Sequence, residues 1–344
     1  LLRFLVLMIK YQKKVSVIAE VGSNHSGKII NCIKAVKAAK DSGADCVKFQ
    51  LYDEKTIAHP KQLTLGYIKN NKFKFQRDRF KSLKLDFDKI KKIHSYCKKI
   101  NIDFCVTPFD HKLVKRLSKY VNFFKIASGD INYLPLLKEV KKTGKKCIIS
   151  TGMSEYKDIR RALTILGKKK TSILHCIASY PTNFNDCNLE NIKYLKKEFK
   201  VPVGFSDHTS GIEASMNSVF FGAEIIEKHF LPSEKIKKVA DYELSIKPSQ
   251  MKQMTEGIKN NINMVGSIKN KVLKCEKYFS INLKRSLYFS EKFSEEKKIT
   301  LETINFLRPY NKKGIKLENY TSIVGKRLKK KVKKHELVCK KHFF

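Results

Sequence analysis

The sequence predicts a closed (β/α)8 TIM barrel of the α/β class, followed by a small C-terminal domain. Two observations lead to the barrel: short, mostly continuous apolar segments alternate with helical patterns, and eight such segments are enough to close a parallel sheet. An open, doubly wound sheet is the alternative, but the strand count favours closure. The expected strands are residues 15–22, 46–51, 103–107, 123–128, 146–151, 171–176, 203–207 and 224–229.

The first strand–helix–strand unit, residues 15–51, has a pattern that the chain then repeats. A β-favouring run ends at Glu20, and the next residues have the composition of a turn and a helix start. Apolar residues then recur at helical spacing until Gly43 ends the helix. The second strand ends with Lys48 and Gln50 on one face. A buried strand has little reason to hold these side chains unless something polar binds there.

The helical patterns between the later strands complete the barrel. They cover residues 87–100, 112–119, 133–142, 155–166, 189–199, 211–221 and 248–265. A polar, lysine-rich insertion at residues 53–86 is expected to form a lid over the barrel. The expected domains are a catalytic barrel at residues 9–265, a linker at 266–282 and a small domain at 283–344.

The N-terminal residues are apolar but do not predict a membrane anchor. The run from Leu1 to Met8 is far shorter than the ~20 residues of a membrane-spanning helix, and it lacks a small-residue cleavage site. Met8 is a candidate for the real first residue, which would make Leu1 to Leu7 an upstream artefact. We therefore expect no contact with a membrane.

The composition is strongly basic. The chain has 72 Lys and Arg against 32 Asp and Glu, a formal net charge of +40, which by itself would suggest nucleic acid. Lysines predominate and lie along the whole length, and no aromatic–basic nucleic-acid motif is present. We interpret the charge as a solvated surface. A nucleic-acid-binding protein stays as the alternative from another functional class.

The nine cysteines form no C-x-x-C pair. Four of them, Cys46, Cys105, Cys147 and Cys176, fall in expected buried strands, where a free thiol behaves as a small apolar residue. This usage argues against a disulfide framework and against structural zinc. It favours the reducing environment of the cytoplasm.

Functional side chains gather at the carboxyl ends of the expected strands, which meet at one rim of the barrel and hold the active site in such folds. In strand order they are Glu20; Lys48 and Gln50; Thr107 and Phe109; Lys125, Ser128 and Asp130; Ser150 and Thr151; His175, Cys176, Ser179 and Tyr180; Ser206, Asp207 and His208; and Glu227, Lys228 and His229. One member alone, such as Thr107, could equally cap a helix. The whole ring is more polar than stability requires, so we predict that it binds substrate.

Part of this ring is suited to a metal ion. Strands one, seven and eight become neighbours about 4.8 Å apart when the barrel closes, so Glu20, His208 and His229 are expected to meet. A lone histidine is more often structural, but two at adjacent strand ends favour a divalent ion with positions left open to substrate. Mn²⁺ is our first expectation, with Mg²⁺, Co²⁺ or Zn²⁺ as alternatives.

The other part of the ring is suited to an anion. Lys48 and Lys125 share the rim with hydroxyl groups, which come from Thr107, Ser128, Ser150 and Ser206. Ammonium groups together with hydroxyl donors predict a site for a small phosphorylated, carboxylated molecule.

These motifs, taken together and in order from about Val15 to the end of the chain, resemble the sialic acid synthase family, which includes N-acetylneuraminate, legionaminic acid and pseudaminic acid synthases. The barrel motifs are Ala19-Glu20-Val21-Gly22, Lys48-Phe49-Gln50, Thr107-Pro108-Phe109, Lys125-Ile126-Ala127-Ser128, Ser150-Thr151-Gly152-Met153, Phe205-Ser206-Asp207-His208 and Glu227-Lys228-His229-Phe230. The segment from Leu283 resembles the family's small antifreeze-like (SAF) domain. Its motifs are Arg285-Ser286-Leu287-Tyr288, Leu307-Arg308-Pro309, Gly314-Ile315 and Ile323-Val324-Gly325-Lys326.

The resemblance implies a transferase that makes precursors of cell-surface polysaccharide. Such enzymes condense phosphoenolpyruvate with the open-chain aldehyde of an acetamido sugar and release phosphate with C–O cleavage. The acceptor would be N-acetylmannosamine or a 2,4-diacetamido-trideoxyhexose, and the product a nine-carbon 2-keto acid.

The resemblance also implies roles for individual residues. His208 and His229 would hold the metal that polarises the aldehyde oxygen, and Glu20 would be the acid/base. Asp241 would contact the sugar, and Arg308 would reach it from the partner's SAF domain in a domain-swapped homodimer. Phosphoenolpyruvate would be held by Lys48, Gln50, Thr107, Lys125, Ser128, Ser150 and Ser206.

Three positions differ from the family's usual pattern. Ile177 and Ala178 stand where most members have Thr and then Ser or Asn, although Ser179 offers a displaced hydroxyl. Asp130 stands where sialate synthases often have Glu, and Val239 and Ala240 stand where the family usually has a Gly-Pro-like pair before Asp241. These changes bear on the choice of sugar more than on the reaction.

Two further interpretations stay open at this point. A 3-deoxy-octulosonate-phosphate or heptulosonate-phosphate synthase is also a barrel enzyme that condenses phosphoenolpyruvate with an aldose, but its acceptor carries a phosphate and it normally lacks the C-terminal domain. An inactive family member with a scaffolding role is suggested only by Ala178.

Overall fold

A computed structural model describes residues 15–66, 68, 72–237, 239–266 and 270–343. The candidate start at Met8 and the run that precedes it lie outside the described residues. The described chain divides into two units, with the boundary between Gly266 and Ser267.

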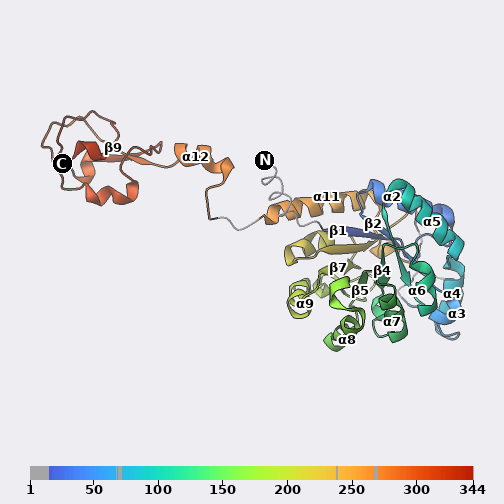
Figure 1. Ribbon diagram of the computed structural model, residues 1–344. Coiled ribbons are helices and arrows are strands. Elements are labelled where there is room, and N and C mark those ends of the chain that lie inside the picture. Colours follow the sequence, from blue (N-terminus) through green and yellow to red (C-terminus); the bar gives the residue numbers. More distant parts are fainter. Residues whose placement is uncertain (1–14, 67, 69–71, 238, 267–269, 344) are drawn as a thin grey trace. The chain divides into compact units, whose positions relative to one another are not determined.

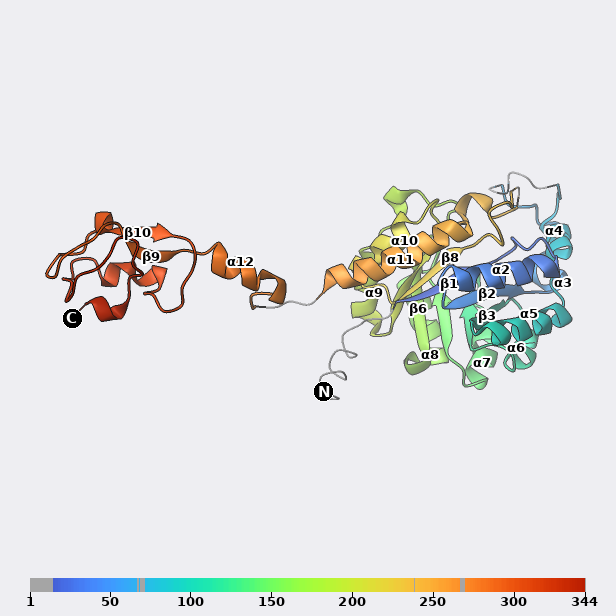
Figure 2. The same ribbon diagram turned by 90° about the horizontal axis from the view of Figure 1, so that it is seen from above.

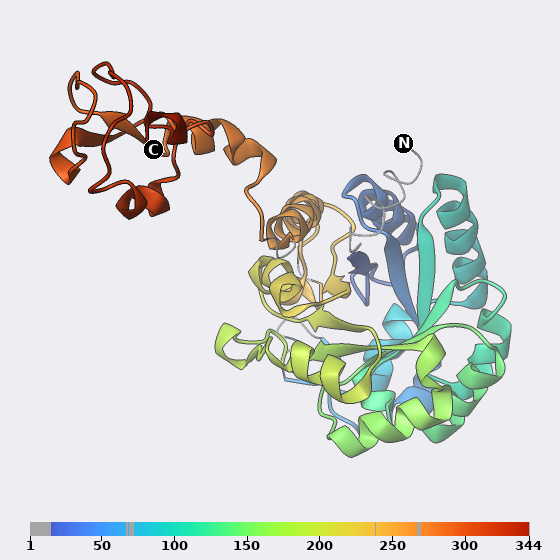
Figure 3. The ribbon, with the colours of Figure 1, turned by 60° about the vertical axis from the view of Figure 1, so that its left-hand side comes forward.

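The first unit is a closed barrel of eight parallel strands in the order β1 to β8, with β8 paired to β1. This confirms the predicted fold class. The strands are β1 Ser16–Glu20, β2 Cys46–Leu51, β3 Asp103–Pro108, β4 Phe123–Ile126, β5 Cys147–Ser150, β6 Thr171–Cys176, β7 Val203–Asp207 and β8 Ile225–His229. Helices cover the outside of the strands in chain order (Figures 1 and 3).

The helices of the barrel also follow the predicted pattern. They are α2 Ile29–Asp41, α5 Phe87–Ile100, α6 His111–Leu117, α7 Leu134–Lys142, α8 Tyr156–Leu166, α9 Asn191–Phe199, α10 Glu213–Asn217 and α11 Pro248–Val265. Local chemistry sets several boundaries: the Asp86 carboxylate accepts from the Lys89 N–H to begin α5, and Asn101, with φ of 56°, ends it. The expected helix at 211–221 is α10 followed by a 3-10 helix, η4, Ser218–Phe221.

Two elements outside the simple repeat complete this unit. The insertion predicted at residues 53–86 contains two short helices, α3 Glu54–Ile57 and α4 Gln76–Leu83. The last helix, α11, packs against both α10 and α2, as Figure 2 shows. Closure of the barrel therefore brings the last helix, α11, into contact with the first, α2.

Alternate residues of each strand point into the barrel and form layers of side chains. The layer that precedes the carboxyl ends of the strands is apolar. One residue from each strand forms this floor: Ile18, Cys46, Cys105, Phe123, Ile148, Leu174, Gly204 and Ile225. The larger core lies between the strands and the helices. Cys46, Cys105, Cys147 and Cys176 are buried free thiols, as predicted.

The second unit has its own small core. Strands β9 Ser286–Phe289 and β10 Ile304–Leu307 pair antiparallel, and Leu287, Phe289 and Ile304 are buried with several other apolar residues. A short helix, α12 Lys277–Asn282, lies in the segment expected to be a linker. The assignment of this unit as an SAF domain stays a prediction.

Candidate active site

The candidate site is the second inward-facing layer of the barrel, two residues further along each strand than the apolar floor. Its members are Glu20, Lys48, Thr107, Lys125, Ser150, Cys176, Ser206 and Glu227, and each is at most 4% exposed. The same alternation that builds an apolar floor therefore places a layer of charged, hydroxyl and thiol groups above it. The interior of the barrel becomes polar at the carboxyl ends of the strands, where active sites of this fold lie.

Lys48 is at the centre of this layer. Its Nζ lies 2.8 Å from Glu20 Oε2 and 3.7 Å from Glu227 Oε1, and it donates to Thr107 Oγ1 at 3.3 Å. The Gln50 amide, one further step along the same face of β2, donates to Glu20 Oε1 at 2.8 Å. Strand register explains the contact, since Glu20 and Lys48 are Cα partners in β1 and β2.

Lys125 forms the other half of the layer. It donates to Ser150 Oγ at 2.6 Å, and its Nζ lies 3.4 Å from Glu227 Oε1. Ser206 Oγ donates to the same carboxylate oxygen at 3.1 Å. Glu227 therefore lies between both lysines, while its other oxygen, Oε2, is buried with no hydrogen-bond partner among the described residues.

The two carboxyl groups of the layer are shifted in opposite directions. Burial raises the pKa of Glu20, although Lys48 opposes the shift, and the charge of Glu227 adds to it. Burial acts on Glu227 in the same way, but Lys125 and Lys48 outweigh it and hold its pKa at about 2. Glu20 is therefore the carboxyl suited to carry a proton, and Glu227 the permanent anion.

Glu20, His208 and His229 lie together, as the strand order predicts. Glu20 and His229 are Cα partners in β1 and β8, and the ring centroids of His208 and His229 are 5.5 Å apart. His208 Nδ1 donates to the Ile177 carbonyl at 2.8 Å, so Nε2 is the nitrogen left for a ligand. Burial lowers the pKa of His229, which keeps the imidazole neutral.

The histidine pair is compatible with a divalent ion. His229 Nδ1 is buried without a hydrogen-bond partner among the described residues, and a neutral ring nitrogen of this kind is a good ligand for borderline metals. No group of three or more His, Cys, Asp or Glu side chains in the described part of the chain could hold a metal. An ion here would rest on two imidazoles and take its other ligands from substrate or water.

Asp241 lies beside this pair. Its Oδ2 is 3.7 Å from His229 Nδ1 and accepts from Ser23 Oγ at 2.9 Å. Asn24 secures the loop after β1 by donating to the Phe230 carbonyl at 3.0 Å. Residues from the first strand–helix loop and from the loop after β8 thus form one wall of the site.

Three other predicted residues lie near the layer. Ser128 Oγ accepts from the Gly152 N–H at 3.0 Å and lies 3.7 Å from Cys176 Sγ. The Tyr180 ring centroid is 4.4 Å from that of His208. Asp130 has a buried Oδ2 without a hydrogen-bond partner among the described residues, and burial raises its pKa to about 6.

The contacts of the remaining predicted residues lead elsewhere. Phe109 packs edge-on against Tyr52 with ring centroids 6.2 Å apart. Ser179 is exposed, and its hydroxyl donates to the Pro181 carbonyl. Arg308 is exposed in the second unit, whose position relative to the barrel is not defined.

The sequence places Glu227 and Cys176 at strand ends, but our sequence-based prediction gives neither of them a role in the site. Glu227 is two residues before His229 on β8, so the alternation of a strand already places both on the inward face. The two-residue spacing between Glu227 and His229 was therefore enough to predict that Glu227 faces the site. Cys176 gave no such signal, because a thiol in a buried strand is indistinguishable from a core residue.

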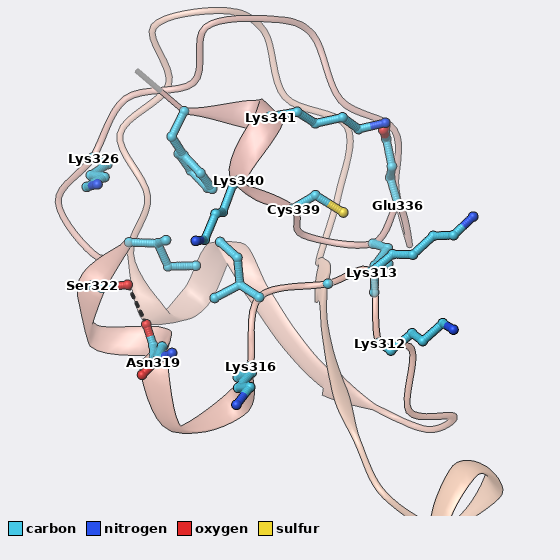
Figure 4. Close-up of a pocket in the computed structure, with 15 residues that line it drawn as sticks. Lys312, Lys313, Lys316, Asn319, Ser322, Lys326, Glu336, Cys339, Lys340 and Lys341 are labelled. Carbon is cyan, nitrogen blue, oxygen red and sulfur yellow. Dashed lines mark hydrogen bonds between the residues drawn. The ribbon is translucent and has the colours of Figure 1, made fainter.

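A large cavity in the second unit is a weaker candidate for the catalytic site. It has a volume of about 1050 Å³, and six lysines and Glu336 are among the residues that line it. Figure 4 shows Lys312 and Lys313 on one side of the cavity and Lys326 on the other, so these three lysines do not converge on one ligand. The interior of the barrel, with buried and mutually oriented charges, fits a reaction centre better.

No helix among the described residues is long and apolar enough to cross a membrane.

The chain is similar to known proteins along most of its length. Residues 35–270 match the model of the NeuB family. The chain is 36% identical to the N,N'-diacetyllegionaminic acid synthase of Campylobacter jejuni, covering 95% of this chain and 99% of that one. It is 34% identical to the N-acetylneuraminate-9-phosphate synthase of Drosophila melanogaster, covering 73% and 69%.

Solved structures give the same result. The N-acetylneuraminic acid synthetase of Leptospira borgpetersenii, in complex with citrate, matches with a TM-score of 0.68 and 31% identity, covering 77% of this chain and 90% of that one. A truncated 3-deoxy-D-arabino-heptulosonate 7-phosphate synthase of Thermotoga maritima, at 14% identity and a TM-score of 0.56, shares the fold alone. By its sequence and its fold, the chain belongs to the NeuB family.

Proposed function

We infer that the chain is a synthase that condenses phosphoenolpyruvate with the aldehyde of an acetamido sugar to give a sialic-acid-type 2-keto acid and phosphate. The observation that carries this inference is the pair Lys48 and Lys125, buried in the barrel and sharing one ionised carboxylate, Glu227. Burial raises the pKa of Glu20, and whenever Glu20 takes up a proton, one positive charge of this buried layer is left uncompensated. Such a layer favours a small anion.

The residues have separate tasks in this reaction. Lys48 and Lys125, with the hydroxyls of Thr107, Ser150 and Ser206, bind and orient phosphoenolpyruvate. C3 of the enol attacks the aldehyde carbon to form the new C–C bond, and water adds at C2. Breaking the C2–O bond then releases phosphate. Glu20, with its raised pKa, is placed to exchange a proton with water or with the developing hydroxyl.

The acceptor class is tested with purified protein and phosphoenolpyruvate. The panel contains N-acetylmannosamine, its 6-phosphate, a 2,4-diacetamido-trideoxyhexose, arabinose 5-phosphate and erythrose 4-phosphate, and released phosphate is measured. We expect turnover with an acetamido sugar. Turnover only with the last two phosphates would instead identify a 3-deoxy-octulosonate-phosphate or heptulosonate-phosphate synthase.

We further propose that His208 and His229 bind a divalent ion, Mn²⁺ first, with Mg²⁺ or Co²⁺ as alternatives. The support is His229 Nδ1, which is buried and has no hydrogen-bond partner in the described part of the chain, beside a second imidazole whose Nδ1 is already bonded. When bound, the ion would supply positive charge for the oxygen of the aldehyde, which becomes negative as the C–C bond forms.

This proposal predicts that a chelator abolishes phosphate release and that added Mn²⁺ restores it. The matched control is the same chelator saturated with Mn²⁺ beforehand, which should have no effect. Full activity of a protein shown by elemental analysis to be free of metal would refute the assignment.

We also propose that Arg308 contacts the sugar from the partner's C-terminal unit, in a domain-swapped homodimer. The proposal is supported by the exposure of Arg308 and by the absence of any arginine from the second inward-facing layer of the described barrel. A partner's guanidinium would supply hydrogen-bond donors that the lysine pair, occupied by phosphoenolpyruvate, does not offer.

A further inference from the structure

We propose that the buried pair Asp207 and Lys228, on the outer face of the barrel wall, positions His208 for its ligand. The proposal rests on the function inferred above, in which His208 serves the acceptor side of the reaction. Asp207 and Lys228 are therefore positioning residues, because their side chains point away from the site.

The location of the pair follows from strand alternation. Ser206 and Glu227 are Cα partners in β7 and β8, and they point inward, where they share a hydrogen bond of 3.1 Å. Asp207 and Lys228 are the next Cα partners in this register and so point outward, between the strands and α10. Both side chains are 0% exposed, and Lys228 is among the largest fully buried side chains of the protein.

The pair is bonded to the turn that carries His208. Lys228 Nζ lies 3.1 Å from Asp207 Oδ2 and donates to the Thr209 carbonyl at 2.6 Å. Asp207 Oδ1 accepts from the Thr209 N–H at 2.8 Å and from its hydroxyl at 2.7 Å. Ser215 of α10 donates to Asp207 Oδ2 at 2.6 Å. The residues on both sides of His208 are thus held from outside the barrel.

Contacts at the rim hold His208 itself. The Thr182 N–H donates to the His208 carbonyl at 2.9 Å, and the ring donates through Nδ1 to the Ile177 carbonyl. The ring reaches that carbonyl only if the backbone from Asp207 to Thr209 keeps its place. The outer pair thereby determines which ring nitrogen faces His229.

The chemistry of the pair points to such a role. A buried ion pair is weak evidence for stability, since apolar residues of similar volume often serve the core equally well or better. A lysine that satisfies both a carboxylate and a backbone carbonyl does what an apolar residue cannot: it ties the turn to β8, the strand that ends in His229. Partners that orient a ligating histidine typically change metal affinity by 10–100-fold when they are lost.

The test is a double variant, Asp207→Leu with Lys228→Met. It removes both charges and the hydrogen bonds that the two side chains make to Thr209, and it fills the same space with apolar side chains. We expect a folded protein whose Mn²⁺ dissociation constant, measured by titration of the metal-free protein, rises by about 10–100-fold. Phosphoenolpyruvate affinity should be unchanged, because Lys48 and Lys125 are untouched. The control is Ile226→Val, a fully buried residue on the same outward face of β8, which lowers stability without touching the turn.

Nitrogen NMR of His208 gives a readout that needs no metal. The wild-type ring should be the Nδ1–H tautomer, and the double variant should lose this preference. If the double variant does not fold, Ser215→Ala removes one bond to Asp207 and should produce both effects more weakly.

The proposal would be overturned if the folded double variant had both the Mn²⁺ dissociation constant and the His208 tautomer of the wild type. If only Ser215→Ala folds, the same two measurements on that variant decide. If instead His208→Ala leaves the Mn²⁺ affinity of the protein unchanged, the metal assignment fails, and the NMR readout still decides the positioning role.

Discussion

Glu20 and Glu227 show how position alone gives two identical side chains different properties. Both are buried in one layer, but Glu227 lies between two ammonium groups and stays ionised, whereas Glu20 faces one lysine and a competing anion. The raised pKa of Glu20 suits a group that must both give and take a proton.

Replacing Glu20 with Gln tests this assignment. The amide keeps the shape and can still bond Gln50 or Lys48, so phosphoenolpyruvate should bind with near-normal affinity in a fluorescence or calorimetric titration. The loss of a positioned acid/base should lower kcat by ~10²–10⁴-fold. A kcat near that of the wild type would reassign Glu20 to a structural role.

Asp130 should make the folded protein less stable as the pH rises. Its pKa is about 6 in the folded protein against an ordinary value of 3.8, so between these pH values the folded state holds a proton that the unfolded state has lost. Stability therefore falls from about pH 4 to about pH 6 and stays lower above that range. Asp130→Asn should raise the free energy of unfolding by about 1–3 kcal/mol at pH 7.5, with the gain disappearing toward pH 4.

Urea unfolding at both pH values measures this gain, and the exposed Asp186→Asn is the control. The same variant should slow turnover if Asp130 contacts the sugar, since groups that are unfavourable to folding are often kept for function. An equal gain at both pH values would show that titration of Asp130 is not its cause.

At the scale of elements, the eight strands of the barrel contribute side chains to the same two layers in its interior. Each strand supplies one floor residue and, two residues later, one member of the polar layer. Gly204 is the floor residue of β7, and it is a glycine because there is no room for a side chain. A Cβ there would lie 2.1 Å from the Ile225 carbonyl oxygen and 2.7 Å from Leu174 Cδ2.

Gly204→Ala should therefore destabilise the barrel by roughly 1–3 kcal/mol or more, because the obstacle includes the backbone of the neighbouring strand. Denaturant unfolding measures the change. Gly66→Ala is the matched control, since a Cβ there meets nothing within 4 Å, and it should be neutral or slightly stabilising. Equal stability of Gly204→Ala and the wild type would mean that β7 shifts freely against β8.

At the scale of the whole molecule, the proposal to test is that Arg308 of one chain serves the barrel of a partner. The barrel contains the proposed anion site and the histidine pair, while Arg308 lies in the second unit. If the second unit of each chain serves the barrel of its partner, two different inactive variants should repair each other in a mixed dimer.

The experiment mixes Glu20→Gln and Arg308→Ala proteins after dissociation and reassociation. A swapped heterodimer has one site with a normal barrel and a normal arginine, so about a quarter of wild-type activity should return for random exchange of equal amounts. Two Glu20→Gln samples with distinguishable tags control for the exchange itself. If exchange occurs and no activity returns, Arg308 acts within its own chain or not at all.

The sequence by itself determined the barrel and most of its site. The local pattern was enough to predict the strands, and β2, β6 and β7 have the predicted bounds. A short continuous apolar run that ends at turn residues is typical of a buried strand. Strand order alone then brought Glu20, His208 and His229 together, since closure makes β8 the neighbour of β1.

The tertiary structure alone decided the electrostatics. Nothing local distinguishes Glu20 from Glu227; their pKa values separate because of charges that lie on other strands and far away in sequence. Lys228 is the extreme case: the sequence places it at the polar rim between Glu227 and His229, yet it points outward and is paired with Asp207. Strand alternation decides which face a charge occupies. What the charge pairs with depends on closure of the whole barrel, and no window of sequence contains that information.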